Sequence, residues 1–133
     1  AGALEQTLVD LAQVVSDPTP KLILADELEA ITEPGAGARI IAGMLLAARA
    51  QKDTSMMLVT HLAPAIIEAS GVDDFRVDGI EARGLDSELE LIVDRTPIRN
   101  HLARSTPELI VKRLVERSSG NAKSLFDDIL QMF

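Results

Sequence analysis

Two uninterrupted apolar runs, with a helical pattern between them, constrain the fold of this chain most. Residues 21–25 and residues 55–60 both lack the regular polar alternation of a half-exposed strand. Such runs are typical of parallel strands that are covered on both faces. Between them, residues 35–51 repeat apolar side chains at helical spacing. Strand, helix and strand in this order predict a parallel βαβ unit with a right-handed crossover.

The rest of the chain predicts mostly helix, with one antiparallel strand pair. We expect helices at residues 3–16, 65–70 and 106–117, with proline and glycine breaks between segments. Ser105 and Glu108 have the spacing of a capping box at the start of the third of these helices. Residues 75–83 and 88–94 predict two strands joined by residues 84–87. A last helix carries an apolar stripe, which is either core or a partner surface: Leu125, Phe126, Ile129, Leu130 and Phe133.

Composition excludes several classes of site. A chain of 133 residues without cysteine has no disulfide and no thiolate metal site, and two histidines argue against a His-built one. The net charge of −8 argues against a large phosphate-backbone footprint, and three phenylalanines are too few for a stacking platform. The start resembles no signal peptide, and the most apolar run, residues 40–48, is too short to span a bilayer. We expect a protein without a membrane segment that works in the cytoplasm.

Polar side chains follow both predicted strands. Asp26 and Glu27 come after the first strand, and Thr60 and His61 end the second. Ligands of open parallel sheets bind at the carboxyl ends of the strands. In a nucleotide-hydrolysing site one acid holds Mg²⁺, usually through water, and a second orients the attacking water. Solvated turn residues and a helix-capping histidine are the plainer interpretation of the same residues.

An apolar strand ending in Asp-Glu, then a loop, a helix and a strand ending in Thr-His, resembles the C-terminal half of an ABC-type ATPase domain. More narrowly, the order resembles the MutS family of DNA mismatch-repair ATPases, including archaeal MutS-like proteins. In that alignment LILADE is the Walker B motif, LEAITEPGAG covers the D-loop, and VTH is the H-switch. GALE is the tail of the signature loop, and TPELIVKRL falls in matching order downstream. The resemblance covers nearly the whole chain.

The resemblance implies a fold and a domain division. The fold class is α/β: a partial P-loop NTPase fold of the ABC type, with parallel strands, a crossover helix, an antiparallel strand pair and C-terminal helices. Residues 1–96 are the C-terminal half of the ATPase domain. Residues 97–133 are a helical tail that serves dimerisation.

The resemblance also implies roles for single residues. Asp26 assists Mg²⁺, Glu27 is the catalytic carboxylate, and His61 contacts the γ-phosphate of ATP. Thr32 and Glu33 lie in the D-loop and cross a homodimer interface. Glu5 faces nucleotide bound to the other subunit. DNA is recognised by other domains.

One required motif is missing from these residues. No GxxxxGK[ST] phosphate loop occurs, and its nearest approach, GIEARGLD, has Leu-Asp where Lys-Ser or Lys-Thr must stand. We therefore expect the chain to be inactive alone, to bind ATP and Mg²⁺ only weakly, and to need an N-terminal part of the same protein. Two alternatives stay open: another ABC ATPase, of the chromosome-maintenance or transporter type, and a non-enzymatic α/β interaction module.

Overall fold

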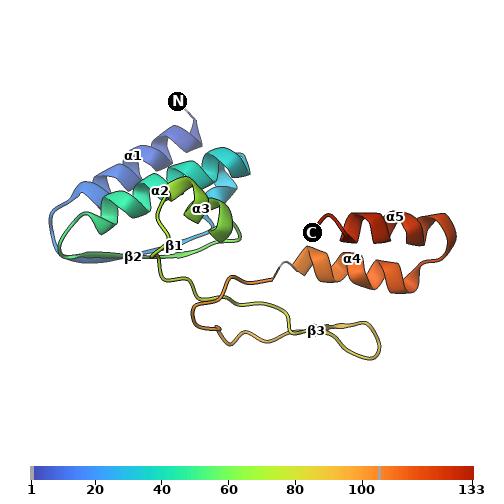
Figure 1. Ribbon diagram of the computed structural model, residues 1–133. Coiled ribbons are helices and arrows are strands. Elements are labelled where there is room, and N and C mark those ends of the chain that lie inside the picture. The colour runs from blue at the N-terminus through green and yellow to red at the C-terminus, as the bar shows by residue number, and fades with distance from the viewer. Residues whose placement is uncertain (1, 105) are drawn as a thin grey trace. The chain divides into compact units, whose positions relative to one another are not determined.

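The computed structural model describes residues 2–104 and 106–133, and the chain forms two compact units, Ala1–Phe75 and Arg76–Phe133 (Figure 1). The first unit contains α1 (Ala3–Ser16), β1 (Lys21–Asp26), the 3₁₀ helix η1 (Leu28–Ile31), α2 (Pro34–Arg49), β2 (Thr54–Val59) and α3 (Ala63–Ser70). The second contains β3 (Gly84–Leu85), β4 (Leu91–Ile92), α4 (Thr106–Arg117) and α5 (Gly120–Leu130). The predicted capping residue Ser105 lies outside the described residues.

The first unit is built on a pair of parallel strands. β1 and β2 pair from Lys21 opposite Thr54 to Asp26 opposite Val59. The predicted strand, helix, strand order is therefore confirmed, and so is the parallel pairing. Because both strands run the same way, their carboxyl ends lie at one edge of the sheet.

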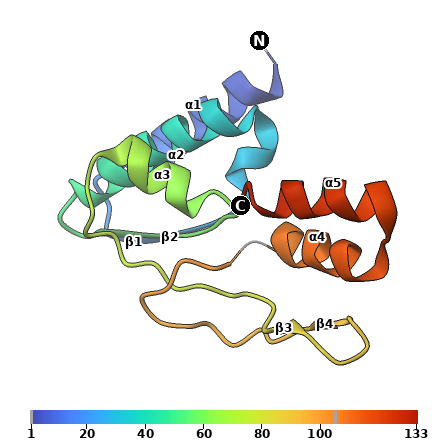
Figure 2. The same ribbon diagram turned by 45° about the vertical axis from the view of Figure 1, so that its right-hand side comes forward.

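Helices cover one face of this strand pair, and the core of the unit lies between them and the strands (Figures 1 and 2). One cluster of buried side chains joins α2 to α3: Ala38, Ile41, Ala42 and Ile66, with Leu58 of β2 against it. A second joins α1 and α2 to the strands through Val15, Ile23 and Ala48. Small residues on α2 allow the close approach of its neighbours. Among the small residues of this helix, Gly37, Ala38, Ala42 and Ala48 are buried and thus serve packing.

The other face of the strand pair is bare in this unit. Leu22 and Leu24 of β1 are 62% and 69% exposed, and Met57 and Val59 of β2 are 62% and 58% exposed. The prediction that the strands are covered on both faces is therefore wrong for the described residues of this unit. The apolar runs had the composition of a doubly covered strand, but all helices of the unit lie over the same face (Figure 1).

The second unit holds a shorter strand pair than predicted. Only Gly84–Leu85 and Leu91–Ile92 pair, antiparallel, and a single bridge joins Gly79 to Ile98. The sequence predicted residues 84–87 as the turn, which is wrong, because two of them, Gly84 and Leu85, form β3. The reversal is made one step later, where the Asp86 carboxylate accepts hydrogen bonds from the amides of Glu88 and Glu90 (2.8 and 3.0 Å). Such a bond from Asp to the backbone two residues on favours a turn.

A partly buried carboxylate fastens residues 101–104 in the same unit. The side chain of Glu81, 14% exposed, lies 3.1 Å from Nε2 of His101 and accepts a hydrogen bond from the amide of Arg104. The Arg104 amide, followed by His101, holds the pKa of Glu81 below its ordinary value of 4.5. The carboxylate form is thus favoured in the folded unit.

Low pH should lower the stability of the second unit, because it protonates the Glu81 carboxylate. Because the folded pKa of Glu81 is lowered, its contribution to stability is present above pH 4.5 and is lost as the pH falls through the lowered value. We expect Glu81→Gln to flatten the fall of stability below pH 4.5, as measured by urea unfolding at several pH values. The matched control is Glu116→Gln, a change at an exposed residue of α4. If stability falls equally steeply with decreasing pH in the two variants, Glu81 is not the source of the acid sensitivity.

α4 and α5 form a helical hairpin at the end of the chain (Figure 2). Leu109 and Val115 of α4 are buried. The predicted apolar stripe of the last helix divides: Phe126, Ile129 and Leu130 are partly buried, whereas Leu125 and Phe133 are 57% and 59% exposed. Three residues of the stripe are thus partly packed, and its role as a partner surface stays a prediction. No helix in the described part of the chain is long and apolar enough to cross a membrane.

Candidate functional site

The candidate site begins where β1 ends. Asp26 is the last residue of β1, opposite Val59, and Glu27 follows it with φ 51° and ψ 42°. The Glu27 amide still donates to the Val59 carbonyl at 2.9 Å, so the parallel ladder runs one residue beyond the strand. A non-glycine residue in the left-handed region is uncommon and is often found at functional sites. The left-handed conformation of Glu27 turns the chain from β1 into η1.

The structure brings Glu27 and His61 together. Oε1 of Glu27 lies 3.4 Å from Nε2 of His61, and the two side chains are 60% and 84% exposed. The contact is an ion pair only when the imidazole is protonated. Asp26 is also exposed. A ligand at this edge of the sheet therefore has open access to two carboxylates and one imidazole.

A third acid, which could not be identified from the sequence, lies in the turn that follows Glu27. Oε1 of Glu29, in η1, accepts hydrogen bonds from the Thr60 hydroxyl and from the His61 amide, the latter at 3.2 Å. Its other oxygen, Oε2, is buried and has no hydrogen-bond partner among the described residues. The available signal was the position of Glu29, three residues after Asp26, in a segment with a tight turn.

The remaining predicted site residues lie on other elements. Thr32 directly follows η1, and Glu33 is the residue before the first turn of α2, where it is exposed. Glu5 lies in the first turn of α1. Their predicted contacts with a second subunit stay predictions.

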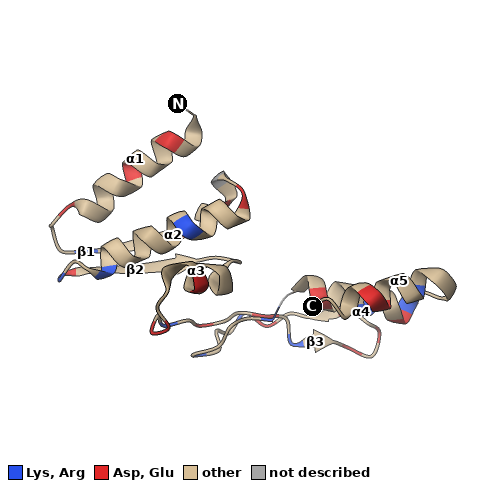
Figure 3. Ribbon diagram, turned by 45° about the horizontal axis from the view of Figure 1, so that its top comes forward, with Lys and Arg blue, Asp and Glu red and all other residues tan. Residues whose placement is uncertain are grey.

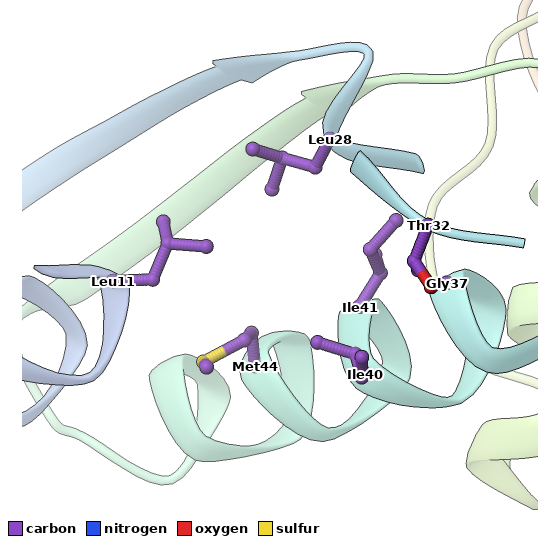
Figure 4. A pocket seen from close by; sticks show the side chains of 7 residues that line it. All are labelled: Leu11, Leu28, Thr32, Gly37, Ile40, Ile41 and Met44. Atoms are coloured by element: carbon purple, nitrogen blue, oxygen red, sulfur yellow. The ribbon is translucent and has the colours of Figure 1, made fainter. Parts of the chain in front are cut away.

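An apolar pocket lies beside the site, between α1, η1 and α2 (Figure 4). It is lined by Leu11, Leu28, Thr32, Gly37, Ile40, Ile41 and Met44. Thr32 carries the one polar side chain among them. Phosphate needs several N–H donors or a cation, which these side chains do not supply.

The side chains at this edge of the sheet can supply only part of the ligands of a Mg²⁺ ion. Among the described residues, no three His, Cys, Asp or Glu side chains lie close enough to hold a metal ion. Mg²⁺, however, keeps several waters and is usually held by one or two carboxylates together with substrate phosphates. The exposed carboxylate of Asp26 suits that mode, in which the nucleotide supplies the other ligands.

The charge around the site is strongly negative. Residues 1–75 contain eleven Asp and Glu but only four Lys and Arg. Every charged residue of α1 is acidic (Figure 3). This unit is therefore poorly suited to bind the phosphate backbone of a nucleic acid.

Fold and site together define an α/β protein with acids and a histidine at the adjoining ends of two parallel strands. Over all 133 residues the chain is 45% identical to the DNA-binding protein MutS2 of Pyrococcus furiosus. The matched segment is 23% of that protein, so the chain spans about a quarter of its length. The resemblance to archaeal MutS-like proteins is thereby confirmed: over its whole length the chain is similar to a part of such a protein. No protein-family model matches it, and neither does any solved structure.

Proposed function

We propose that this chain is part of a MutS-like ATPase of the ABC type, and that it supplies the Walker B, D-loop and H-switch elements. The observation that carries the proposal is the approach of Glu27 to His61 (3.4 Å) at the carboxyl ends of two parallel strands, with Asp26 as the last residue of the first strand. The identity to MutS2 favours this class over chromosome-maintenance and transporter ATPases.

The bare sheet face supports a larger fold around this segment. Two parallel strands are too few for a stable sheet, and parallel sheets are normally covered on both faces. The exposed side chains of Leu22, Leu24, Met57 and Val59 offer a surface for that cover. In the proposed P-loop NTPase fold, residues 1–96 are half of the ATPase domain and residues 97–133 are a helical tail.

The proposed mechanism gives each acid its own task. Glu27 orients the attacking water and takes up its proton, and the exposed position of the carboxylate leaves room for that water. Asp26, at the strand end, holds Mg²⁺ through water. The imidazole of His61 donates to the γ-phosphate and thereby orients it. Bound Mg²⁺ supplies charge neutralisation at the phosphates of ATP.

Other partners follow from the same proposal. Thr32 and Glu33 cross the interface of a homodimer, Glu5 faces the nucleotide of the other subunit, and the final helices help to join the subunits. The relative is named as a DNA-binding protein. We assign DNA recognition to parts outside this acidic segment, in a protein that works in the cytoplasm. ATP hydrolysis is then coupled to recognition of a DNA structure or mismatch.

The test starts with the coding sequence upstream of Ala1. A GxxxxGK[ST] loop after a predicted strand, roughly a hundred residues before Asp26, is the expected result. The full-length protein should then hydrolyse ATP in a Mg²⁺-dependent manner, whereas the 133-residue chain alone should not. A full-length protein without the loop and without hydrolysis contradicts the proposal and favours a non-enzymatic interaction module.

A further inference from the structure

Glu29 joins the two halves of the candidate site. It lies in η1, between Glu27 at the start of that turn and Thr32 at its end. Its Oε1 accepts from the hydroxyl of Thr60 and from the amide of His61 (3.2 Å for the second bond). One carboxylate oxygen thus holds both residues that follow β2. A carboxylate forms stronger hydrogen bonds than a neutral acceptor.

The bonds of Glu29 continue into the turn between β2 and α3. Oγ1 of Thr60 accepts from the amide of Leu62 at 2.9 Å, a local turn closed by a threonine hydroxyl. Leu62 in turn packs against the buried cluster of α2 and α3. Its carbonyl accepts from the amide of Ile66 at 2.9 Å, which starts α3. The backbone of His61 is therefore fixed on both sides, by Glu29 and by the core.

The second oxygen of Glu29 shows that this placement is not favourable for the carboxylate by itself. Oε2 is buried and has no hydrogen-bond partner in the described part of the chain. A buried acceptor without a donor is destabilising. The bonds at Oε1 fix the turn that carries His61.

We propose that Glu29 is a positioning residue that holds the imidazole of His61 beside Glu27. This inference rests on the proposed function, in which both of those residues act on ATP. Glu29 touches neither Nε2 of His61 nor the Glu27 carboxylate through any hydrogen bond in the structure's described range. Glu29 acts through the backbone of His61, and it joins the turn after β2, which contains Thr60 and His61, to η1.

Two variants of the full-length protein test the role of Glu29. Glu29→Ala removes both acceptor oxygens, and Glu29→Gln keeps one oxygen to receive the Thr60 and His61 bonds. We expect Glu29→Ala to speed exchange of the His61 amide hydrogen about tenfold, because its partner is lost. The kcat for ATP should fall about tenfold or more, with KM changed less than about twofold, because the reacting groups are misplaced. Glu29→Gln should restore both, and Glu68→Ala, an exposed change on α3, should alter neither.

The outcomes separate this inference from the function on which it rests. Unchanged exchange at His61 in Glu29→Ala overturns the positioning role. Faster exchange with an unchanged kcat overturns it as well, because Glu29 is then only structural. Loss of kcat in Glu29→Gln equal to that in Glu29→Ala contradicts it too. If the wild-type protein does not hydrolyse ATP, the proposed function fails and the link to His61 chemistry fails with it, whereas the exchange result still reports whether Glu29 fixes the turn.

Discussion

Glu27→Gln in the full-length protein should lower ATP turnover by roughly 10²–10⁴-fold while ATP binding persists. The change keeps the size of the side chain and removes its basicity, so water at the strand end loses its proton acceptor. Because Gln is close to Glu in size and shape, we expect the left-handed backbone at this position and the fold to be kept. Steady-state turnover and the equilibrium Kd for ATP measure the two effects separately.

The control for this variant is Glu68→Gln on α3, an exposed carboxylate of the same unit outside the site. It should hydrolyse ATP at the wild-type rate. Turnover of Glu27→Gln within about twofold of wild type removes Glu27 from the catalytic role, because general-base catalysis contributes much more than that.

Ile41→Ala should lower the free energy of unfolding of the chain by about 2–5 kcal/mol. Ile41 is 2% exposed and lies in the cluster that joins α2 to α3. Its truncation leaves a cavity between helices that are already in close contact through alanines. Urea unfolding of this chain, followed by far-ultraviolet circular dichroism, measures the change.

Leu24→Ala is the matched control for Ile41→Ala. Leu24 is 69% exposed on the bare face of β1, so its substitution by Ala removes little buried apolar surface. We expect its effect on the chain to stay below about 1 kcal/mol. Equal losses for the two variants would mean that the bare face is covered and that the buried cluster does not hold the unit together.

The helices and the parallel pair could be predicted because their signals are local. Apolar residues at helical spacing located α1 and α2 to within about two residues at each end. Pro18 and Pro20 ended α1, and Gly71, with φ 72°, ended α3. The approach of Glu27 to His61 followed from topology alone, since parallel strands finish at one edge.

Other features could not be predicted from the spacing of apolar residues, because they depend on particular hydrogen bonds and on where the helices pack. The turn of the antiparallel pair was misplaced because the hydrogen bonds of the Asp86 carboxylate, and not the glycine at residue 84, fix the reversal. The bare face depends on where the helices lie, which the composition of a strand does not reveal. Glu29 was missed because its hydrogen-bond partners, Thr60 and His61, are 31 and 32 residues away.

A crystal structure of the full-length protein with Mg²⁺ and a non-hydrolysable ATP analogue tests directly whether the ends of β1 and β2 form an ATPase site. We expect the γ-phosphate at the carboxyl ends of β1 and β2, with one water between it and Glu27 and with His61 in hydrogen-bond reach. Nucleotide bound elsewhere, with these strand ends facing solvent, would contradict the assignment of Asp26, Glu27 and His61 to an ATPase site.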